Sequence, residues 1–407
     1  MSNDIKMKQK NKLIPELRFP TFSKTWNAVS VSDICKVYRG GIFSKSDIDE
    51  NGINYCIHYG ELFTKYNEVI SVIYSKTNRD NGFKSKIGDI LMPSSDVTPN
   101  GLAKASAIIL ADVILGGDMN IIRPNEEFNS IFLSYLLNNS QSEIIKLVSG
   151  TTVKHIYPSQ IITCQLPIVN DKFEQQKIAD CLSSLDELII AHNDKLVALK
   201  NHKKGLLQNL FPQKGQKVPN CRFPEFMNDG EWEEKKLGDL AENLDSKRIP
   251  ITSNQREKGS VPYYGASGVI DYVKEYIYDE TLLCISEDGA NLIDRNYPIA
   301  FTISGKTWVN NHAHVLKFEN YKTHILVEKY INSINVQDFL TGMAQPKLNR
   351  GKLDIIPIPL PKNQKEQQKI ADCLLAVDNL ITAQTEKIEQ LKTHKKGLMQ
   401  GLFPKID

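Results

Sequence analysis

The stretch EQQKIADCLSSLDELIIAHNDKLVALKNHKKGLLQNLFP, residues 174–212, returns at residues 366–404 as EQQKIADCLLAVDNLITAQTEKIEQLKTHKKGLMQGLFP. The two copies align without a gap, and Glu366 stands 192 positions after Glu174. A repeat of this length and period marks a duplicated structural unit. The sequence therefore predicts a chain built from two related halves, each of which ends in the repeated stretch.

Apolar residues recur in both copies at alternating spacings of three and four. A stripe of this kind stays on one face of a helix and is typical of a coiled coil. Polar residues interrupt it at matching places, His192 with Gln384 and Lys203 with Lys395. This pattern favours two long helices that pair with each other over two separate amphipathic surface helices. The predicted helix-pair interface consists of Ile178, Leu182, Leu185, Ile189, Leu196, Leu199, Ile370, Leu374, Val377, Ile381, Ile388 and Leu391.

Start and stop signals frame both predicted helices. Asp171 stands three residues before Glu174, and Asn363 three residues before Glu366, which is the spacing of a capping box. A proline closes each stretch, where a helix cannot easily continue. Spacer helices are therefore expected within residues 171–212 and 363–404. Each would be about 50 to 60 Å long at 1.5 Å per residue.

The repeat also includes the opening of each half. PELRFPTF begins at Pro15 and is followed by Trp26, while PNCRFPEF begins at Pro219 and is followed by Trp232. The predicted organisation is a flexible basic tail over residues 1–14, a first domain over 15–170 and a first spacer helix over 171–212. A linker over 213–218, a second domain over 219–362 and a second spacer helix over 363–404 complete it.

The two domain bodies differ strongly in sequence, but both mix strand and helix signals. Short apolar runs bounded by turn residues predict strands, and apolar residues at helical spacing predict helices. We expect α+β domains, each with a mixed sheet and helices. The expected strands are 89–94, 106–110, 120–123, 263–273, 282–286, 299–304 and 313–318, and the expected helices are 131–148 and 325–340.

Composition points to a soluble protein of the cytoplasm. The formal net charge is +2, and the seven cysteines form no CxxC pair, which fits free thiols in a reducing compartment. The N-terminal residues MSNDIKMKQKNK are polar and lack the apolar core of a signal peptide. No stretch approaches the length of apolar sequence that a membrane-spanning helix needs. We therefore predict no contact with a membrane.

No motif predicts catalysis, a cofactor or a metal. Ser304–Thr307 reads SGKT and ends like a phosphate-binding loop, but the leading glycine is replaced by Ala300. Residues 265–268, GASG, lack the spacing of a dinucleotide site. His312 and His314 could share a strand face, but a third zinc ligand at short spacing is missing. We also find no aromatic-ended Pro-Pro tetrapeptide of an amino-methyltransferase and no carboxylate–lysine nuclease cluster.

Both bodies instead carry polar loops suited to duplex DNA. Arginine and lysine match guanine edges, asparagine and glutamine match adenine edges, and serine or lysine can hold phosphates. The predicted DNA-binding residues of the first body are Arg39, Lys45, Ser94, Ser95, Lys104, Lys154 and His155. Those of the second body are Lys247, Arg248, Tyr264, Ser267, Lys306, Trp308, Asn310, Gln345, Lys347, Asn349 and Arg350.

The chain resembles the specificity subunit of type I restriction–modification systems. The resemblance rests on the repeated EQQKIADCL…HKKGLxQxLFP stretches, on the RFPxF…W openings and on YYGASGVIDYV and SGKTWVNNHAHVL in the second body. It extends from about Pro15 to Pro404. It implies two target-recognition domains separated by two long helices packed antiparallel, and a non-catalytic subunit that reads a bipartite DNA site, one half per domain. Because the two bodies differ in sequence, we expect the two half-sites to differ and the site to be asymmetric. The sequence of the first body differs from the strand-rich sequence of the second. The resemblance therefore gives less support to the predicted DNA contacts of the first body than to those of the second.

The resemblance also implies partners. Two adenine-N6 methyltransferase subunits would bind the chain, and two motor-nuclease subunits would join in the full complex. S-adenosylmethionine, ATP and magnesium would belong to those partners. Two other classes are compatible with the loops or the helices: a two-headed DNA-binding regulator that acts without a methyltransferase, and a protein scaffold that binds no duplex. Co-purification with methyltransferase subunits would distinguish a specificity subunit from the DNA-binding regulator, and binding to duplex DNA would distinguish it from the scaffold.

Overall fold

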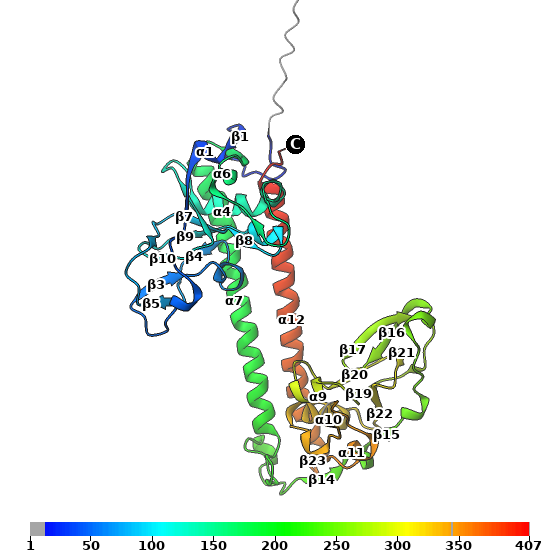
Figure 1. The fold of residues 1–407 in the computed structure, drawn as a ribbon. Helices are drawn as coiled ribbons and strands as arrows, with labels where there is room; N and C mark the ends of the chain where they lie inside the picture. The colour runs from blue at the N-terminus through cyan, green and yellow to red at the C-terminus, as the bar shows by residue number, and fades with distance from the viewer. Residues whose placement is uncertain (1–12, 343–344, 407) are drawn as a thin grey trace, which may run out of the picture. The chain divides into compact units, whose positions relative to one another are not determined.

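The computed structural model describes residues 13–342 and 345–406 (Figure 1). The chain forms two compact units, Met1–Asn193 with Lys387–Asp407, and Asp194–Glu386. Each unit therefore contains one domain body and one half of each long helix. Residues 1–12 of the predicted basic tail lie outside the described residues. Leu13, the next residue, pairs with Trp26 in an antiparallel bridge, so the end of the predicted tail belongs to the first domain.

The first unit contains a five-stranded sheet, a four-stranded sheet and two strand pairs. The five-stranded sheet has the order β2-β11-β7-β9-β4, the four-stranded sheet the order β5-β3-β10-β6, and the pairs are β1-β13 and β8-β12. The strands are β1 (Trp26–Ser30), β2 (Cys35–Arg39), β3 (Asn54–Ile57), β4 (Val69–Ile70), β5 (Ser75–Thr77), β6 (Phe83–Lys84), β7 (Asp89–Pro93), β8 (Ser95–Asp96), β9 (Ser106–Ile108), β10 (Ile114–Leu115), β11 (Met119–Pro124), β12 (Lys154–His155) and β13 (Gln165–Val169). The helices of the body are α1 (Val31–Ile34), α2 (Glu61–Thr64), α3 (Pro99–Leu102), α4 (Ser130–Asn139), α5 (Gln141–Ile145) and α6 (Pro158–Ile161).

The second unit contains two four-stranded sheets and one strand pair. Their orders are β15-β22-β19-β20, β17-β16-β21-β18 and β14-β23. The strands are β14 (Glu233–Lys236), β15 (Glu242–Asn243), β16 (Lys258–Gly265), β17 (Gly268–Val273), β18 (Tyr278–Asp279), β19 (Leu282–Ser286), β20 (Ala300–Ile303), β21 (Lys306–Val309), β22 (Ala313–Lys317) and β23 (Pro357–Leu360). The helices of the body are α8 (Leu237–Leu240), α9 (Asn291–Asp294), α10 (Tyr321–Ser333) and α11 (Arg350–Asp354).

Each expected strand has a counterpart in the structure, but the stretch 263–273 is divided by a turn into the end of β16 and β17. The expected helices differ in extent. The helix expected over 131–148 is interrupted, because α4 ends at Asn139 and α5 begins at Gln141. The helix expected over 325–340 begins earlier and ends at Ser333. It begins earlier because the Asn320 side chain accepts a hydrogen bond from the Lys322 amide and caps α10. A cap five residues before Ile325 was the signal that the periodicity alone missed.

The repeated stretches form α7 (Lys172–Leu210) and α12 (Gln364–Leu402), each 39 residues long. Asp171 caps α7 by accepting a hydrogen bond from the Glu174 amide at 3.3 Å. Asn363 caps α12 by accepting one from the Lys365 amide at 2.9 Å. These caps were predicted correctly as helix starts.

The glutamate half of the predicted capping box is wrong. The Glu174 carboxylate instead accepts two hydrogen bonds from Arg18, both 2.8 Å. Glu366 accepts two from Arg222, both 2.7 Å. Bidentate arginine–carboxylate pairs of this kind are strong and geometrically specific. They tie each RFP opening segment to the start of the long helix of its own half, which explains why the two motifs are repeated together.

Within each unit the two helices run antiparallel. In the first unit, Ile178 and Leu182 near the start of α7 share a core with Leu402 and Phe403 at the end of α12. In the second unit, Leu210 and Phe211 at the end of α7 share a core with residues near the start of α12. The prediction of two mixed α/β domains with a pair of packed antiparallel helices is therefore confirmed. All residues of the predicted helix-pair interface are buried or half-buried.

The lysines that interrupt the apolar stripe form ion pairs between the helices. Lys395 contacts Asp186 at 2.6 Å in the first unit, and Lys203 contacts Asp378 at 2.5 Å in the second. Burial and the nearby Glu68 carboxylate raise the pKa of Asp186. Burial also acts on Asp378, but hydrogen bonds from Lys203 and from a lysine of α10 outweigh it and lower the pKa. An equivalent lysine–aspartate ion pair thus fixes the register of the two helices in each unit, and the charged residues that each domain body places beside it differ.

A tryptophan at the start of each domain packs against the last residues of the repeat. The centre of the Trp26 ring lies 5.9 Å from that of Phe132 and 6.4 Å from that of Phe403, which follows α12. Trp232 lies 6.2 Å from Phe211, which follows α7. The opening of each domain is therefore completed by the end of the helix from the other half of the sequence. None of the helices in the described ranges is long and apolar enough to cross a lipid bilayer.

Candidate nucleic-acid interface

The two units share one strand arrangement although their sequences differ. In the first, β11 lies between β2 and β7; in the second, β22 lies between β15 and β19. Asn120 of β11 pairs with Met92, two residues before Ser94. His314 of β22 pairs with Ile285, two residues before Glu287. Asn120 and His314 are thus equivalent positions, and Ser94 and Glu287 are equivalent too.

A short hairpin loop occupies the same place in both units. Ser149 and His155 exchange backbone hydrogen bonds of 2.9 and 2.8 Å, and Thr341 and Lys347 exchange two of 2.8 Å. The two hairpins are 192 positions apart, so the repeat extends beyond the helices. Each contains a glycine with positive φ, Gly150 in the first unit and its counterpart in the second. A Cβ at Gly150 would lie 2.2 Å from the Val153 carbonyl oxygen, so this turn requires glycine.

Each hairpin pairs with the segment that follows the strand equivalent to β7. Lys154 and His155 pair with Asp96 and Ser95 in the first unit. Lys347 forms a bridge with Asp288 in the second unit. Polar side chains from two chain segments therefore meet at the hairpin in both domains. We call residues 149–155 in the first domain, and residues 341–342 with 345–347 in the second, the recognition hairpins.

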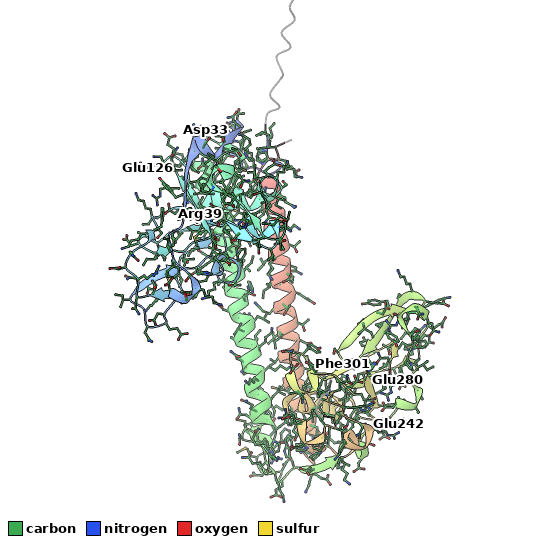
Figure 2. The ribbon with its side chains drawn as sticks, in the orientation of Figure 1. Asp33, Arg39, Glu126, Glu242, Glu280 and Phe301 are labelled. Carbon is green, nitrogen blue, oxygen red and sulfur yellow. The ribbon has the colours of Figure 1, made fainter. Side chains whose placement is uncertain are left out.

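Aromatic and basic side chains gather at the first recognition hairpin. Arg39 lies at the end of β2 (Figure 2). Its guanidinium lies 5.7 Å from the centre of the Tyr157 ring. The His155 ring stacks on Tyr157 with 6.0 Å between centres. Arg39 also lies 3.6 Å from Asp118, and its side chain is half exposed. The structure therefore brings together Arg39, Ser95, Lys154 and His155 from the predicted set.

The remaining predicted residues of the first domain differ in exposure. Lys45 is exposed, at the start of a short 3-10 helix. Lys104 is half-buried, and burial lowers its pKa. Ser94 is 1% exposed, and its hydroxyl has no hydrogen-bond partner among the described residues. Ser94 is thus turned away from the surface, and we revise its role from DNA contact to support of the hairpin.

The second recognition hairpin carries an exposed basic group. The Lys347 side chain is 51% exposed and its amine lies 3.1 Å from Glu287. Arg350 is 62% exposed and lies 3.6 Å from Asp354. Asn349 caps α11 by accepting a hydrogen bond from the Lys352 amide at 3.1 Å. Gln345 and Lys247 are also exposed.

The sheet β17-β16-β21-β18 presents a second group. Lys306 is exposed and lies 4.8 Å from the centre of the Tyr276 ring. Trp308 donates from its indole nitrogen to the Ile249 carbonyl at 2.6 Å. Tyr264 stacks on Phe301 with 5.9 Å between ring centres. Lys306 and Trp308 alternate onto one face of this sheet, whereas Tyr264 lies on the opposite face, because it pairs with Val309 and Trp308 pairs with Tyr263. Ser267 stands exposed in the β16–β17 turn.

Two contacts connect this sheet to the recognition hairpin. The Ser286 hydroxyl at the end of β19 donates to the Ala266 carbonyl in the β16–β17 turn at 2.5 Å. Asn310 accepts a hydrogen bond from the His312 amide at 2.8 Å, and His312 contacts Asp288 beside the hairpin at 2.8 Å. Asn310 is only 5% exposed, so it shapes this connection and we remove it from the predicted base-reading set.

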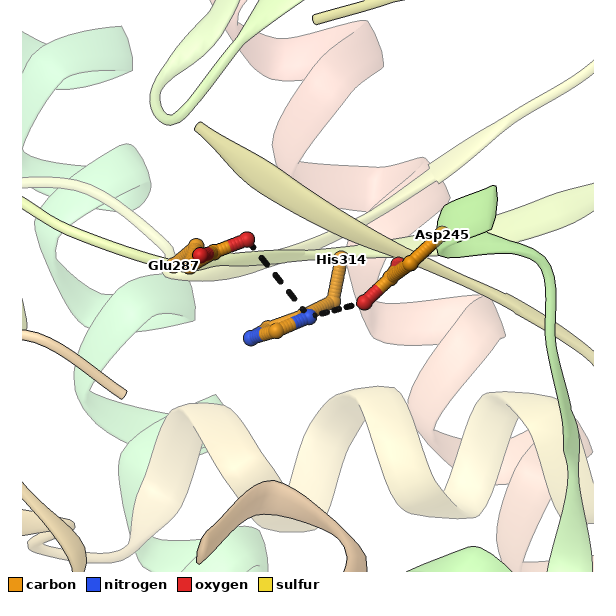
Figure 3. A group of neighbouring side chains, drawn as sticks. All are labelled: Asp245, Glu287 and His314. Atoms are coloured by element: carbon orange, nitrogen blue, oxygen red, sulfur yellow. Dashed lines mark hydrogen bonds and ion pairs between the residues drawn. The ribbon is translucent and has the colours of Figure 1, made fainter. Parts of the chain in front are cut away.

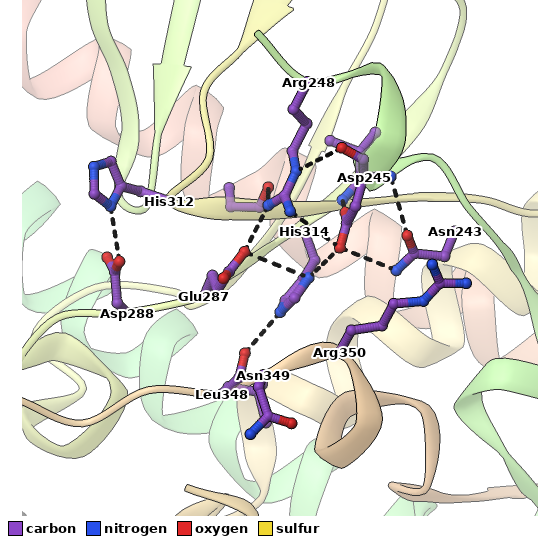
Figure 4. A network of polar contacts seen from close by, with 12 residues as sticks. Asn243, Asp245, Arg248, Glu287, Asp288, His312, His314, Leu348, Asn349 and Arg350 are labelled. Atoms are coloured by element: carbon purple, nitrogen blue, oxygen red, sulfur yellow. Dashed lines mark hydrogen bonds and ion pairs between the residues drawn. The ribbon is translucent and has the colours of Figure 1, made fainter. Parts of the chain in front are cut away.

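Figure 3 shows Asp245, Glu287 and His314 close together. Arg248 joins them in a charge network beside the second hairpin (Figure 4). It contacts Glu287 at 2.6 Å and Asp245 at 3.3 Å, and its side chain is 12% exposed. His314 contacts Asp245 at 2.6 Å. Arg248 was predicted to bind DNA, but its guanidinium is used inside the domain because two carboxylates compete for it. The prediction is corrected accordingly.

The same network argues against a metal centre. Ligand atoms of Asp245, Glu287 and His314 lie within 4.8 Å of one another, which would fit a metal by distance alone. Arg248, however, already supplies the positive charge that a cation would bring. Burial would raise the pKa of Asp245, but hydrogen bonds from His314 and Val315 and the charge of Arg248 lower it. We therefore interpret the group as an ion-pair network.

The other motifs weighed in the sequence have structural roles. His312 lies just before β22 and turns to Asp288, whereas His314 points to Asp245, so the two imidazoles do not share a ligand set (Figure 4). Ser304 and Gly305 connect β20 to β21, and Gly305 has a φ of 69°. No helix begins there, and a phosphate loop of the usual kind needs one.

Sequence reasoning missed residues that the fold brings to the hairpins. Tyr157 was not singled out, although it ends a polar loop that was. Asn120, Asp245 and Glu287 were not considered, and His314 was weighed only as a zinc ligand. The available signal was weak: each is a polar residue within or beside an apolar strand. Which segments meet them depends on strand order, which the sequence did not provide.

Comparison with known proteins agrees with this architecture. The model of the family described as "Type I restriction modification DNA specificity domain" matches residues 23–201 and 229–393. The type I restriction enzyme MjaVIII specificity subunit of Methanocaldococcus jannaschii is 23% identical over 418 residues, with 95% of this chain and 93% of that protein covered. A Haemophilus influenzae protein provisionally named a type I restriction enzyme specificity subunit is 37% identical over 161 residues. That match covers 39% of this chain and 41% of that protein.

Solved structures show the same fold. The crystal structure of the S subunit of a type I restriction–modification system from M. genitalium matches with a TM-score of 0.66 and 17% identity, covering 97% of this chain and 100% of that one. A chain from a structure that concerns complex assembly in the type I system matches with a TM-score of 0.54 and 15% identity, covering 94% and 99%.

Proposed function

This chain belongs to the family of type I restriction modification DNA specificity domains, and we propose that it reads an asymmetric, bipartite duplex site, one half with each domain. Proteins of this family give a type I restriction enzyme its DNA specificity and are not catalytic themselves. The chain is thus a specificity subunit. Its proposed reading surfaces are the two recognition hairpins and the polar side chains around them.

One observation carries the proposal of two different half-sites. The recognition hairpins occupy equivalent places in the two domains but carry different side chains. His155 of the first corresponds to Lys347 of the second, and their neighbours are Ser95 and Asp288. Base edges are distinguished by the pattern of donors and acceptors that a protein presents. Two unlike patterns on one frame support an asymmetric site rather than a palindrome.

Family membership supports the proposal for partners and cofactors. We propose that two adenine-N6 methyltransferase subunits bind this chain, and that two motor-nuclease subunits join the complete complex. S-adenosylmethionine, ATP and magnesium then belong to those subunits. This chain supplies the DNA contacts, and its role in the reaction is to place the target adenine before the methyltransferase.

Reconstitution tests the proposal. The chain combined with its methyltransferase subunits should methylate adenines at one bipartite sequence, detected by long-read sequencing of the treated DNA. The chain alone, with duplex and S-adenosylmethionine, should transfer no methyl groups. Robust transfer by the chain alone would contradict the specificity-subunit role. Duplex binding by a chain that captures no methyltransferase subunit would instead favour a two-headed DNA-binding regulator.

Removal of the exposed amine at the second hairpin should weaken reading of one half-site. For Lys347→Ala we expect a loss of about 1–3 kcal/mol in binding, the usual value of one base contact. Gln345 and Arg350 stand exposed beside it, so other contacts should remain. Methylation rates on the cognate duplex and on duplexes altered singly in each half-site provide the measurement.

Lys235→Ala is the matched control for this variant. Lys235 lies on β14, its side chain is 46% exposed, and it pairs with Glu233 at 3.4 Å. The control removes the same charge from an exposed position outside the proposed reading surface, and it should retain the wild-type rate. If Lys347→Ala matches the wild type on every duplex, Lys347 does not contact the DNA.

A further inference from the structure

The residue that follows each recognition hairpin is held by its backbone from two directions. Its amide donates to the carbonyl at the end of the neighbouring strand segment: Ile156 to Ser94 at 3.1 Å, and Leu348 to Glu287 at 2.7 Å. Both residues have fully buried side chains. Ile156 and Leu348 therefore fix one end of each hairpin to the domain core.

The carbonyl of the same residue is held by a buried polar side chain. Asn120 donates from Nδ2 to the Ile156 carbonyl at 3.0 Å. His314 lies with Nε2 2.7 Å from the Leu348 carbonyl, which can only accept. Asn120 is 0% and His314 1% exposed. Burial of a polar group is unfavourable unless it forms hydrogen bonds. Both ring nitrogens of His314 have a partner, whereas Asn120 bonds through Nδ2 alone and its Oδ1 has no hydrogen-bond partner among the described residues.

The second domain extends this contact into a network that reaches the hairpin surface. The other ring nitrogen of His314 faces Asp245 at 2.6 Å. The second carboxylate oxygen of Asp245 accepts a hydrogen bond from the Val315 amide at 2.9 Å. Glu287 accepts from Arg248 at 2.6 Å with one oxygen and contacts Lys347 at 3.1 Å with the other. A chain of contacts thus runs from the core strand to the exposed lysine.

We propose that Asn120 and His314 are positioning residues, each of which holds the recognition hairpin of its own domain in place and thereby sets how strictly that domain discriminates its half-site. The inference rests on the proposed function. Neither side chain touches DNA, because both are buried. Different residues perform the same task at equivalent positions, which supports a common role for them.

A fixed hairpin improves discrimination for a physical reason. Reading side chains must lie within about 0.5 Å of their productive positions, and supporting hydrogen bonds keep them there. A hairpin released at one end could adjust to an incorrect base pair, and its ordering on DNA would cost additional entropy. The loss should therefore appear as weaker discrimination in one half-site, with the other unaffected.

The test uses the full chain reconstituted with its methyltransferase subunits and three substitutions. His314→Leu removes both hydrogen bonds of the ring, His314→Gln keeps an amide donor near the place of Nε2, and Asn120→Leu removes the bond in the first domain. The ratio of methylation rates on cognate and singly altered duplexes is measured for each half-site. The exposed His202 on α7 provides the control, His202→Leu.

His314→Leu should lower discrimination in the second half-site by roughly five- to thirtyfold, the factor for loss of one or two net hydrogen bonds. Discrimination in the first half-site should not change. Asn120→Leu should show the reverse, and His314→Gln should recover much of the loss. His202→Leu should match the wild type in both halves. A purely structural role would lower overall activity with both ratios unchanged, which would overturn the inference.

Amide hydrogen exchange on the chain alone gives a second readout that does not need methylation. The Thr341 and Lys347 amides, which bond each other's carbonyls, should exchange faster in His314→Leu than in the wild type, while Ser149 and His155 should not change. Equal protection in both proteins would overturn the inference even if the variant loses activity. If the wild-type complex methylates no bipartite site, the proposed function itself fails; if it does and the variants match it, only the inference fails.

Discussion

Exchange of residues 219–360 for the corresponding domain of a related subunit should change one half of the recognised site completely and leave the other half unaltered. The second recognition hairpin, the charge network beneath it and the sheet β17-β16-β21-β18 all lie within these residues. The first hairpin and its surroundings lie entirely in the first unit. Each domain thus contains all the side chains that we propose for reading its half-site.

The structure also defines which donor domain should be chosen. Arg222 and Trp232 lie inside the exchanged segment, but their partners Glu366 and Phe211 lie outside it. Arg222 is 5% and Glu366 0% exposed at the side chain, and removal of one partner from a buried ion pair typically costs about 3–5 kcal/mol. A donor that has the RFPxF…W opening keeps both contacts, whereas a donor without it should fold poorly.

Sequencing of adenine methylation by the reconstituted complex provides the measurement. The reciprocal exchange of residues 15–170 is the control and should change only the opposite half-site. Simultaneous change of both halves after either exchange would show that the domains read DNA jointly. Failure of a donor without the opening motif, together with success of a donor that has it, would support the structural role of Arg222 and Trp232.

Much of the fold could be predicted because it is repeated. Two copies of one apolar stripe predicted paired helices, and the polar residues at matching places, Lys203 and Lys395 among them, fitted contact between the two helices. The nature of that contact, an ion pair with Asp378 or Asp186, could not be predicted because the alignment of the helices was unknown. The glutamates at the helix starts were assigned to local capping, whereas they bind arginines more than a hundred residues away.

The site was harder to predict because a polar loop residue can point inward as well as outward. Ser94, Arg248 and Asn310 stand in polar segments, yet the fold turns all three inside. His314 and Asn120 lie on strands, and their partners are brought to them only by strand order. Local sequence shows which segments are polar; tertiary contacts decide which of their side chains remain available to DNA.

The second large effect is expected from a change in helix length. We propose that the helix pair sets the length of the unread gap between the half-sites, as a resemblance to two domains separated by long helices implies. The two units divide α7 between Asn193 and Asp194, and α12 between Glu386 and Lys387. One heptad inserted at each of these places leaves the Asp186–Lys395 and Lys203–Asp378 pairs intact within their units.

Such a protein should fold but should no longer methylate the original site. Seven residues add roughly 10 Å to a helix at 1.5 Å each, or about three base pairs of B-DNA at 3.4 Å each. Three base pairs also rotate the duplex by about 100°, at one turn per 10–10.5 base pairs. A heptad rotates an ideal helix by only about 20°. The two domains would therefore no longer match the original half-sites, either in their separation or in their rotation about the DNA axis.

The matched control inserts fourteen flexible residues, the same number as the two heptads together, into the linker 213–218, which contains no helix or strand. This protein has nearly the same added mass but unchanged helices, so it should keep the original site and gap. Thermal unfolding of both proteins establishes that each is folded, and mapping of methylated adenines reports the site. Because both ion pairs and both domain cores remain in the lengthened protein, a loss of activity cannot be attributed to them. Methylation of the original site with the original gap by the lengthened protein would show that the helices do not set that distance.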